Sequence, residues 1–138
     1  PLSVWDTWES AGRWVVNQMP AGKVALAGLS LGGMLAVEIM QFGAERVTKL
    51  ALLDTGMRGQ NEAERAIRRA RIRLADEGHF ELVLGMQMAR FLPAYRLPDK
   101  MLDDEVMAMC GEHGMEISKR QAERAGSRAD RSADLRNI

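Results

Sequence analysis

The chain has 138 residues, of which 46% are hydrophobic and 28% charged, and this length and composition suit a globular protein with a buried core. Its 19 Lys+Arg residues balance its 19 Asp+Glu residues, so it lacks the long-range positive field that attracts nucleic acid or an anionic membrane. The single cysteine, Cys110, has no partner for an internal disulfide, and no apolar run approaches the ~20 residues that span a bilayer. We therefore expect a cytoplasmic protein that binds neither nucleic acid nor membrane.

The N-terminal residues predict an amphipathic helix. Ser3 is typical of an N-cap, and Asp6 stands three residues later, where a capping box has its acidic side chain. Apolar residues then recur at helical spacing until Met19. All three tryptophans of the chain lie on this helix, and we expect them to pack against a sheet.

Two short apolar runs predict strands on either side of a second helix. Residues 23–29 and 47–53 have the pattern typical of strands that are buried on both faces. The segment 31–43 between them has helical periodicity, and Gly43 predicts its end as a C′ glycine. The order of strand, helix and strand predicts a parallel pair joined by a right-handed crossover.

After these elements the pattern becomes entirely helical. Four helices are predicted, over residues 62–76, 80–91, 99–113 and 115–125. Gly78, Gly114 and Gly126 predict the ends of the first, third and fourth of them. The predicted organisation is an α/β segment over residues 1–56, a helical cap over residues 57–126 and a polar linker over residues 127–138.

The junction between the first strand and the following helix has the sequence Gly28-Leu29-Ser30-Leu31-Gly32. A serine in this G-x-S-x-G pattern lies on a tight turn that lifts its hydroxyl clear of the sheet. We expect a strained backbone at Ser30, and glycine at Gly28 and Gly32 to remove Cβ atoms that would collide. The amide of Leu31 begins the helix and is placed to stabilise an oxyanion. The pattern thus predicts a nucleophilic serine, with an incidental serine in a glycine-rich turn as the alternative.

The residues around this junction resemble a known family. Residues 24–34, then Glu45-Arg46-Val47 and residues 50–55, are similar to the nucleophile-elbow region of α/β-hydrolase fold proteins. The resemblance is strongest to the esterase-like and C–C-bond-hydrolase-like branch with a helical cap. It implies a doubly wound parallel sheet, of which this chain carries a βαβ fragment. The segment from about Gly56 to Ala125 stands where that family inserts its helical lid.

The resemblance also implies a reaction. A serine hydrolase of this family acts through an acyl-enzyme on Ser30, without a cofactor or metal, on a small acyl substrate: a carboxylic ester, a thioester, a lactone or a C–C bond next to a carbonyl. The family's histidine and acid follow later strands, and its other oxyanion loop follows an earlier one. Because the chain begins at Pro1 without a methionine and stops at Ile138 in mid-pattern, we expect an internal fragment. Alone, it should be inactive and prone to association, and its oligomeric state is left open.

Two alternatives remain at this point. Ser30, Asp54 and either His79 or His113 follow the order of a triad within the chain, with Asp54 at the end of the strand beside the elbow. The alternative function is a non-catalytic interaction module, or a truncated hydrolase completed by another chain.

Other clusters favour structural roles. Cys110 and His113 are one helical turn apart, but a zinc site needs three or four ligands and the chain has no second Cys/His pair. The arginines of segment 62–76 are interspersed with acidic residues, which indicates a solvated face, with docking of an acidic partner or an anionic substrate as the alternative. Most methionines of the helical segment are expected in its core, and some in an acyl pocket.

Overall fold

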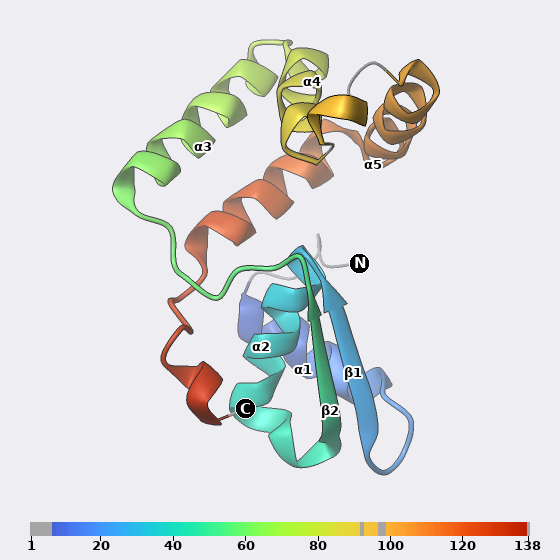
Figure 1. The fold of residues 1–138 in the computed structure, drawn as a ribbon. Coiled ribbons are helices and arrows are strands. Elements are labelled where there is room, and N and C mark those ends of the chain that lie inside the picture. Colours follow the sequence, from blue (N-terminus) through green and yellow to red (C-terminus); the bar gives the residue numbers. More distant parts are fainter. Residues whose placement is uncertain (1–6, 92, 97–98, 138) are drawn as a thin grey trace. The chain divides into compact units, whose positions relative to one another are not determined.

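A computed structural model describes residues 7–91, 93–96 and 99–137 (Figure 1). Over these residues the chain is a mixed α/β protein with five α-helices and a two-stranded parallel sheet. It divides into two compact units. The α/β unit comprises Pro1–Asn61 and Arg124–Ile138, and the helical unit comprises Glu62–Glu123. Within the described part, no helix combines the length and the apolar character needed to cross a membrane.

The first helix, α1 (Trp8–Gln18), has Thr7 as its N-cap. Thr7 has an extended backbone (φ −133°, ψ 158°), and its hydroxyl accepts a hydrogen bond from the Ser10 N–H at 2.9 Å. The Ser10 hydroxyl oxygen accepts from the Thr7 N–H at 3.1 Å, which completes a capping box. The predicted cap, Ser3 with Asp6, lies outside the described residues. The capping box at Thr7 is harder to find in the sequence because its third helical residue is Ser10 instead of the usual Glu or Gln.

The predicted strand pair is confirmed. β1 (Val24–Leu29) and β2 (Val47–Leu53) pair in parallel, and α2 (Leu31–Gly43) connects them. In the register of the pair, Gly28 lies opposite Leu52, so the end of β1 is in line with the end of β2. Whatever follows the two strands therefore emerges at one edge of the sheet.

The end of α2 differs from the prediction. Gly43 has φ −136° and still belongs to the helix, so the expected left-handed C′ glycine is wrong. The chain passes directly into a 3-10 helix, Ala44–Arg46. This tighter turn ends α2 without a residue of positive φ.

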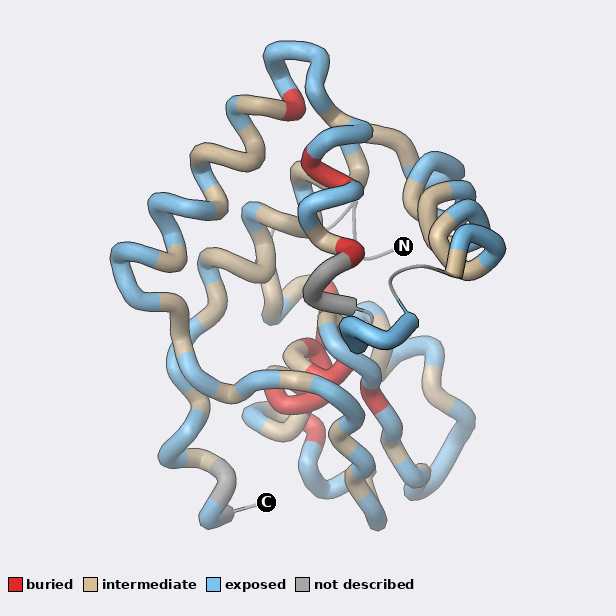
Figure 2. The backbone as a smooth tube through the Cα atoms, turned by 45° about the horizontal axis from the view of Figure 1, so that its top comes forward, coloured by how far each residue is buried: buried red, intermediate tan, exposed pale blue. Residues whose placement is uncertain are grey.

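The core of the α/β unit lies between the sheet and the helices α1 and α2. Ala11 of α1 and Leu35 and Ile39 of α2 form its centre, and Leu26 of β1 packs against them. Buried positions, which include six residues of α2, are red in Figure 2. The helices therefore cover the face of the sheet to which Leu26 belongs.

The opposite face of the sheet is exposed. Leu29 is 63% exposed and Leu53 is 52% exposed, and Ala25, Ala27 and Ala51 are exposed as well. Side chains alternate between the two faces of a strand, so these five residues share one face. The prediction that both strands are buried on both faces is wrong, because α1 and α2 pack on one face only.

The tryptophans of the first helix have different surroundings. Trp5 lies outside the described residues. Trp8 packs against the core, and its Nε1 donates a hydrogen bond to the Arg124 carbonyl at 3.1 Å. Trp14 is 38% exposed, so the expected burial against the sheet is wrong for this residue.

The helices of the second unit follow the prediction closely. α3 (Glu62–Asp76) and α4 (Phe80–Phe91) have the predicted bounds, and Gly78 between them has φ 91°. α5 (Lys100–Ser127) is interrupted at Gly114, where φ is 73° and ψ is 169°. It therefore consists of two helices joined at the predicted glycine, and the second of them passes the predicted end by two residues.

The methionines divide between core and surface. Met88 is buried, as are Ala75, Val83 and Leu84. Met86, Met101 and Met109 are exposed, by 45%, 84% and 59%. The expected core role is thus wrong for these three. In α5 the physical reason is spacing, because Met101, Met107 and Met109 point in widely different directions around a helix of 3.6 residues per turn.

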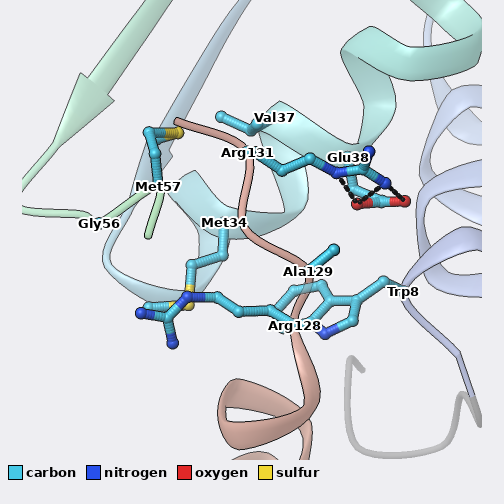
Figure 3. Close-up of a pocket in the computed structure, with 9 residues that line it drawn as sticks. All are labelled: Trp8, Met34, Val37, Glu38, Gly56, Met57, Arg128, Ala129 and Arg131. Carbon is cyan, nitrogen blue, oxygen red and sulfur yellow. Dashed lines mark hydrogen bonds and ion pairs between the residues drawn. The ribbon is translucent and has the colours of Figure 1, made fainter. Parts of the chain in front are cut away.

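The C-terminal segment is bonded to other parts of the α/β unit. The Arg131 N–H donates to the Met57 carbonyl at 2.8 Å, and its guanidinium forms an ion pair with Glu38 of α2 (Nη2 to Oε1, 3.0 Å). Figure 3 shows the Arg131 side chain directed at the Glu38 carboxylate. The predicted polar linker over residues 127–138 is thus bonded to α2 through two charged side chains that lie far apart in sequence.

Candidate active site

Ser30 stands between β1 and α2 in a backbone conformation that residues with side chains rarely adopt. Its φ is 49° and its ψ is −112°, and its side chain makes no hydrogen bond that caps α2. An ordinary N-cap serine has an extended backbone and accepts a hydrogen bond from the second or third residue of the helix. The expected strain at Ser30 is confirmed, and its exposed side chain is not used to cap the helix.

The glycines around Ser30 have partly different roles from those predicted. A Cβ on Gly28 would lie 2.6 Å from the carbonyl carbon of Gly32, so no side chain fits there, as predicted. A Cβ on Gly32 would meet no heavy atom within 4 Å, which contradicts the predicted collision. Gly28 lies against the backbone of Gly32. This close contact requires Gly28, but not Gly32, to lack a side chain.

A second close approach lies at Gly33. A Cβ on Gly33 would be 2.5 Å from Cγ2 and 2.7 Å from Oγ1 of Thr55. Gly33 is buried in the first turn of α2, and Thr55 follows β2 by two residues. The missing side chain of Gly33 therefore lets Thr55 lie against the start of the helix.

β2 and the residues that follow it bind both peptide groups of Ser30. The Ser30 N–H donates to the carbonyl of Leu53, the last residue of β2, at 2.9 Å. Its carbonyl accepts from the Thr55 hydroxyl at 2.7 Å, and from the N–H groups of Gly33 and Met34 at 3.0 and 3.2 Å. The strained backbone is thus fixed from two sides, as a residue of this kind requires.

Leu31 is the first residue of α2 and directly follows Ser30. The first N–H groups of a helix have no partner inside it, and the helix dipole adds a partial positive charge at this end. The Leu31 amide is therefore one of the groups that favour negative charge beside Ser30. Its role as an oxyanion donor stays a prediction.

Asp54 and the two histidines belong to different units. Asp54 follows β2 and has φ 41°; it and Ser30 are the non-glycine residues with positive φ in the described chain. His79 and His113 lie in the helical unit, and His113 Nδ1 is 3.0 Å from the Met109 carbonyl of its own helix. The described α/β unit thus holds Ser30 and Asp54 without a histidine, and the internal triad stays a prediction.

A small pocket of the α/β unit lies beside α2 (Figure 3). Trp8, Met34 and Glu38 line it together with Arg128 and Arg131 of the C-terminal segment, and Ser30 does not. The charged groups of these residues bond within the chain: Arg128 donates to nearby carbonyls and Arg131 pairs with Glu38. The pocket lies where the C-terminal segment packs against α2, and it is not part of the site at Ser30.

The helical unit holds the other clusters that the sequence singled out, the Cys110–His113 pair and the arginines of α3. Among the described residues, no three or more His, Cys, Asp or Glu side chains gather to hold a metal, and Cys110 is half-buried. On α3, Arg69 Nη2 lies 2.5 Å from Glu62 Oε1, and Arg65 lies 3.7 Å from the other oxygen. The hydrogen bond from Arg69 lowers the pKa of the Glu62 carboxyl group. Such exposed ion pairs are typical of a solvated helix face.

A scan of the sequence against models of known protein families gives no match, and a search of curated proteins gives none either.

The sequence pattern predicted no role at the site for Thr55 or Gly33. A signal for Thr55 was present, because parallel strands end at the same edge of a sheet and Thr55 follows the strand next to the elbow. The need for glycine at Gly33 had no such signal. It arises only from the approach of Thr55, which the one-dimensional pattern does not contain.

Proposed function

We propose that this chain carries the nucleophile, one oxyanion donor and the helical lid of a serine hydrolase with the α/β-hydrolase fold. The observation that supports this most is the conformation of Ser30, whose φ is 49° and whose side chain does not cap α2. Strain of this kind costs about 1–3 kcal/mol and gathers at functional sites. An incidental serine in a glycine-rich turn would gain stability by relaxing to an ordinary N-cap.

In the proposed reaction, the Ser30 hydroxyl attacks the carbonyl carbon of an acyl substrate and gives its proton to a general base. The carbonyl oxygen becomes an oxyanion, which the Leu31 N–H stabilises. The bond to the leaving alcohol or thiol breaks, and the leaving group takes the proton. Water then attacks the acyl-enzyme, which releases the acid and restores the hydroxyl.

We propose, as the family resemblance implies, that the base and the acid come from polypeptide outside residues 1–138. The chain by itself should then hydrolyse no p-nitrophenyl ester. Steady turnover that is abolished by Ser30→Ala would overturn this part of the proposal in favour of a triad with Asp54 and a histidine of the helical unit.

The acyl-transfer half of the proposal is testable without a base. In a Cys110→Ala background, Ser30→Cys places a thiolate nucleophile at the elbow. Thr7→Cys in the same background is a matched control, because Thr7 also directly precedes a helix and is also exposed. Each thiol is acylated with p-nitrophenyl acetate and, separately, alkylated with iodoacetamide. Alkylation forms no oxyanion, so the ratio of the two rates measures oxyanion stabilisation, independent of the fraction of thiolate.

We expect the ratio of acylation to alkylation to be at least about tenfold higher at position 30 than at position 7, since one oxyanion donor is worth about 10²–10³ in rate in working enzymes. Equal ratios at the two positions would contradict the hydrolase proposal. They would favour the alternative, an interaction module that has the fold without the chemistry.

A further inference from the structure

Thr55 is the group outside α2 that holds the Ser30 carbonyl. Its hydroxyl donates to that oxygen at 2.7 Å, which is shorter than the bonds to the same oxygen from Gly33 (3.0 Å) and Met34 (3.2 Å). Two local features bring Thr55 there. Asp54 turns the chain with φ 41° directly after β2, and Gly33 leaves the space that the Thr55 side chain fills.

The carbonyl of Ser30 and the N–H of Leu31 belong to one peptide group. A peptide group is planar and trans, so its C=O and N–H point in opposite directions and turn together. A hydrogen bond that fixes the Ser30 carbonyl therefore fixes the direction of the Leu31 N–H. Within the proposed function, this N–H is the oxyanion donor.

We infer that Thr55 is a positioning residue, whose hydroxyl orients the peptide between Ser30 and Leu31 so that the Leu31 N–H faces the oxyanion. This inference rests on the proposed function and extends it to a residue that touches no substrate. Thr55 acts on the donor and not on the nucleophile. Its loss should therefore impair reactions that form an oxyanion and spare reactions that do not.

The test uses the Ser30→Cys, Cys110→Ala protein with two further variants at Thr55. Thr55→Ser keeps the hydroxyl without the methyl group, and Thr55→Ala lacks both, so these two variants differ by the hydroxyl alone. We expect Thr55→Ala to lower the rate of acylation by p-nitrophenyl acetate about tenfold, because a donor displaced by about 1 Å loses up to about 10²-fold in rate. Alkylation by iodoacetamide should change less than about twofold, and Thr55→Ser should restore acylation.

Two outcomes would overturn the inference. Thr55→Ala could leave the ratio of acylation to alkylation unchanged, or it could lower both rates together with the melting temperature, which is what a merely structural residue would do.

Failure of the proposed function gives a different result. If the parent Ser30→Cys protein has no higher ratio than the Thr7→Cys protein, then Ser30 is not a hydrolase nucleophile. A crystal structure of the Thr55→Ala variant then decides the role of Thr55. Rotation of the peptide between Ser30 and Leu31, seen as a change of ψ at Ser30 from −112° together with a change of φ at Leu31, supports the positioning role, and an unchanged peptide contradicts it.

Discussion

The starts of α1 and α2 use the same kind of residue in opposite ways. Thr7 has an extended backbone, and its hydroxyl oxygen accepts a hydrogen bond from the Ser10 N–H, so the side chain stabilises the helix that follows. Ser30 has a positive φ, and its side chain accepts no such bond, although it also stands directly before a helix. The hydroxyl at α1 stabilises the fold. The hydroxyl at α2 is available for other chemistry, at a cost to stability.

The two sites also differ in what surrounds them. Thr7 and Ser10 form their capping box with each other, within four residues of sequence. Ser30 depends on Leu53 and Thr55, more than twenty residues away. The strained residue is therefore held by long-range hydrogen bonds, whereas the relaxed cap needs only local ones. Substitutions at the two sites should reveal this difference.

Adding a side chain at Gly28 should have the largest effect on stability. A methyl group on Gly28 would lie 2.6 Å from the Gly32 carbonyl carbon, and backbone can give way there only by moving α2. We expect Gly28→Ala to lower the free energy of unfolding by about 3 kcal/mol, at the upper end of overpacking costs. Chemical denaturation followed by circular dichroism measures the change.

Gly32→Ala is the matched control for this experiment. It places the same methyl group four residues later, where no heavy atom lies within 4 Å, and alanine favours the helix by about 0.5–1 kcal/mol over glycine. We expect no loss of stability from it. Equal destabilisation by the two variants would show that the elbow is not held by the close approach at Gly28.

Substitutions at the two helix starts should change stability in opposite directions. Thr7→Ala removes a cap and should cost about 1 kcal/mol. Ser30→Gly relieves a positive φ and should stabilise the protein by about 1 kcal/mol, while Ser30→Ala should stay within about 0.5 kcal/mol of the wild type. The same denaturation experiment gives all three values. A loss of about 1 kcal/mol in Ser30→Ala would mean that the hydroxyl stabilises the helix after all, as it does at Thr7.

Low pH should have a smaller effect on stability, and the hydroxyl groups of Thr7 and Ser30 do not titrate there. The Ser132 N–H donates to the Asp130 carboxylate at 2.9 Å, and this bond lowers the pKa of Asp130 below its ordinary value of 3.8. A carboxyl group whose pKa is lower in the folded state stabilises the fold above the unfolded pKa. This stabilisation is lost as the pH falls from 3.8 through the folded value.

We therefore expect stability to fall with acid in the wild type more steeply than in Asp130→Asn, which has no charge to lose. Unfolding measured between pH 5 and the acid limit, on the order of pH 2, tests this. The difference between Thr7→Ala and Ser30→Ala should stay constant over the same range. If the wild type and Asp130→Asn have parallel curves, the Ser132 bond contributes nothing to the pH dependence.

Much of this architecture was predictable because its signals are local. The bounds of α3, α4 and β2 follow from periodicity and from the glycines and prolines beside them. The strain at Ser30 followed from the spacing of glycines around a strand-to-helix turn. The N-cap of α1 was predicted at Ser3 because the capping-box rule looks for an acidic residue, and the actual box at Thr7 uses a serine.

Other features were not predictable because they depend on which residues meet. The exposure of Leu29 and Leu53 depends on which face of the sheet α1 and α2 cover, and an apolar run looks the same whether one face is covered or two. The contact of Arg131 with Glu38 joins residues that lie 93 positions apart, and no local pattern connects them.

The sequence by itself determined the order of strand, helix and strand, the helical character of the second part, and the serine at the turn between β1 and α2. Each of these depends on backbone preferences over a few residues. Tertiary structure decided that Gly33 rather than Gly32 makes the second close approach and that Thr55 holds the Ser30 peptide. The physical reason is that the end of a neighbouring strand supplies both contacts, and only the folded sheet brings that strand beside the elbow.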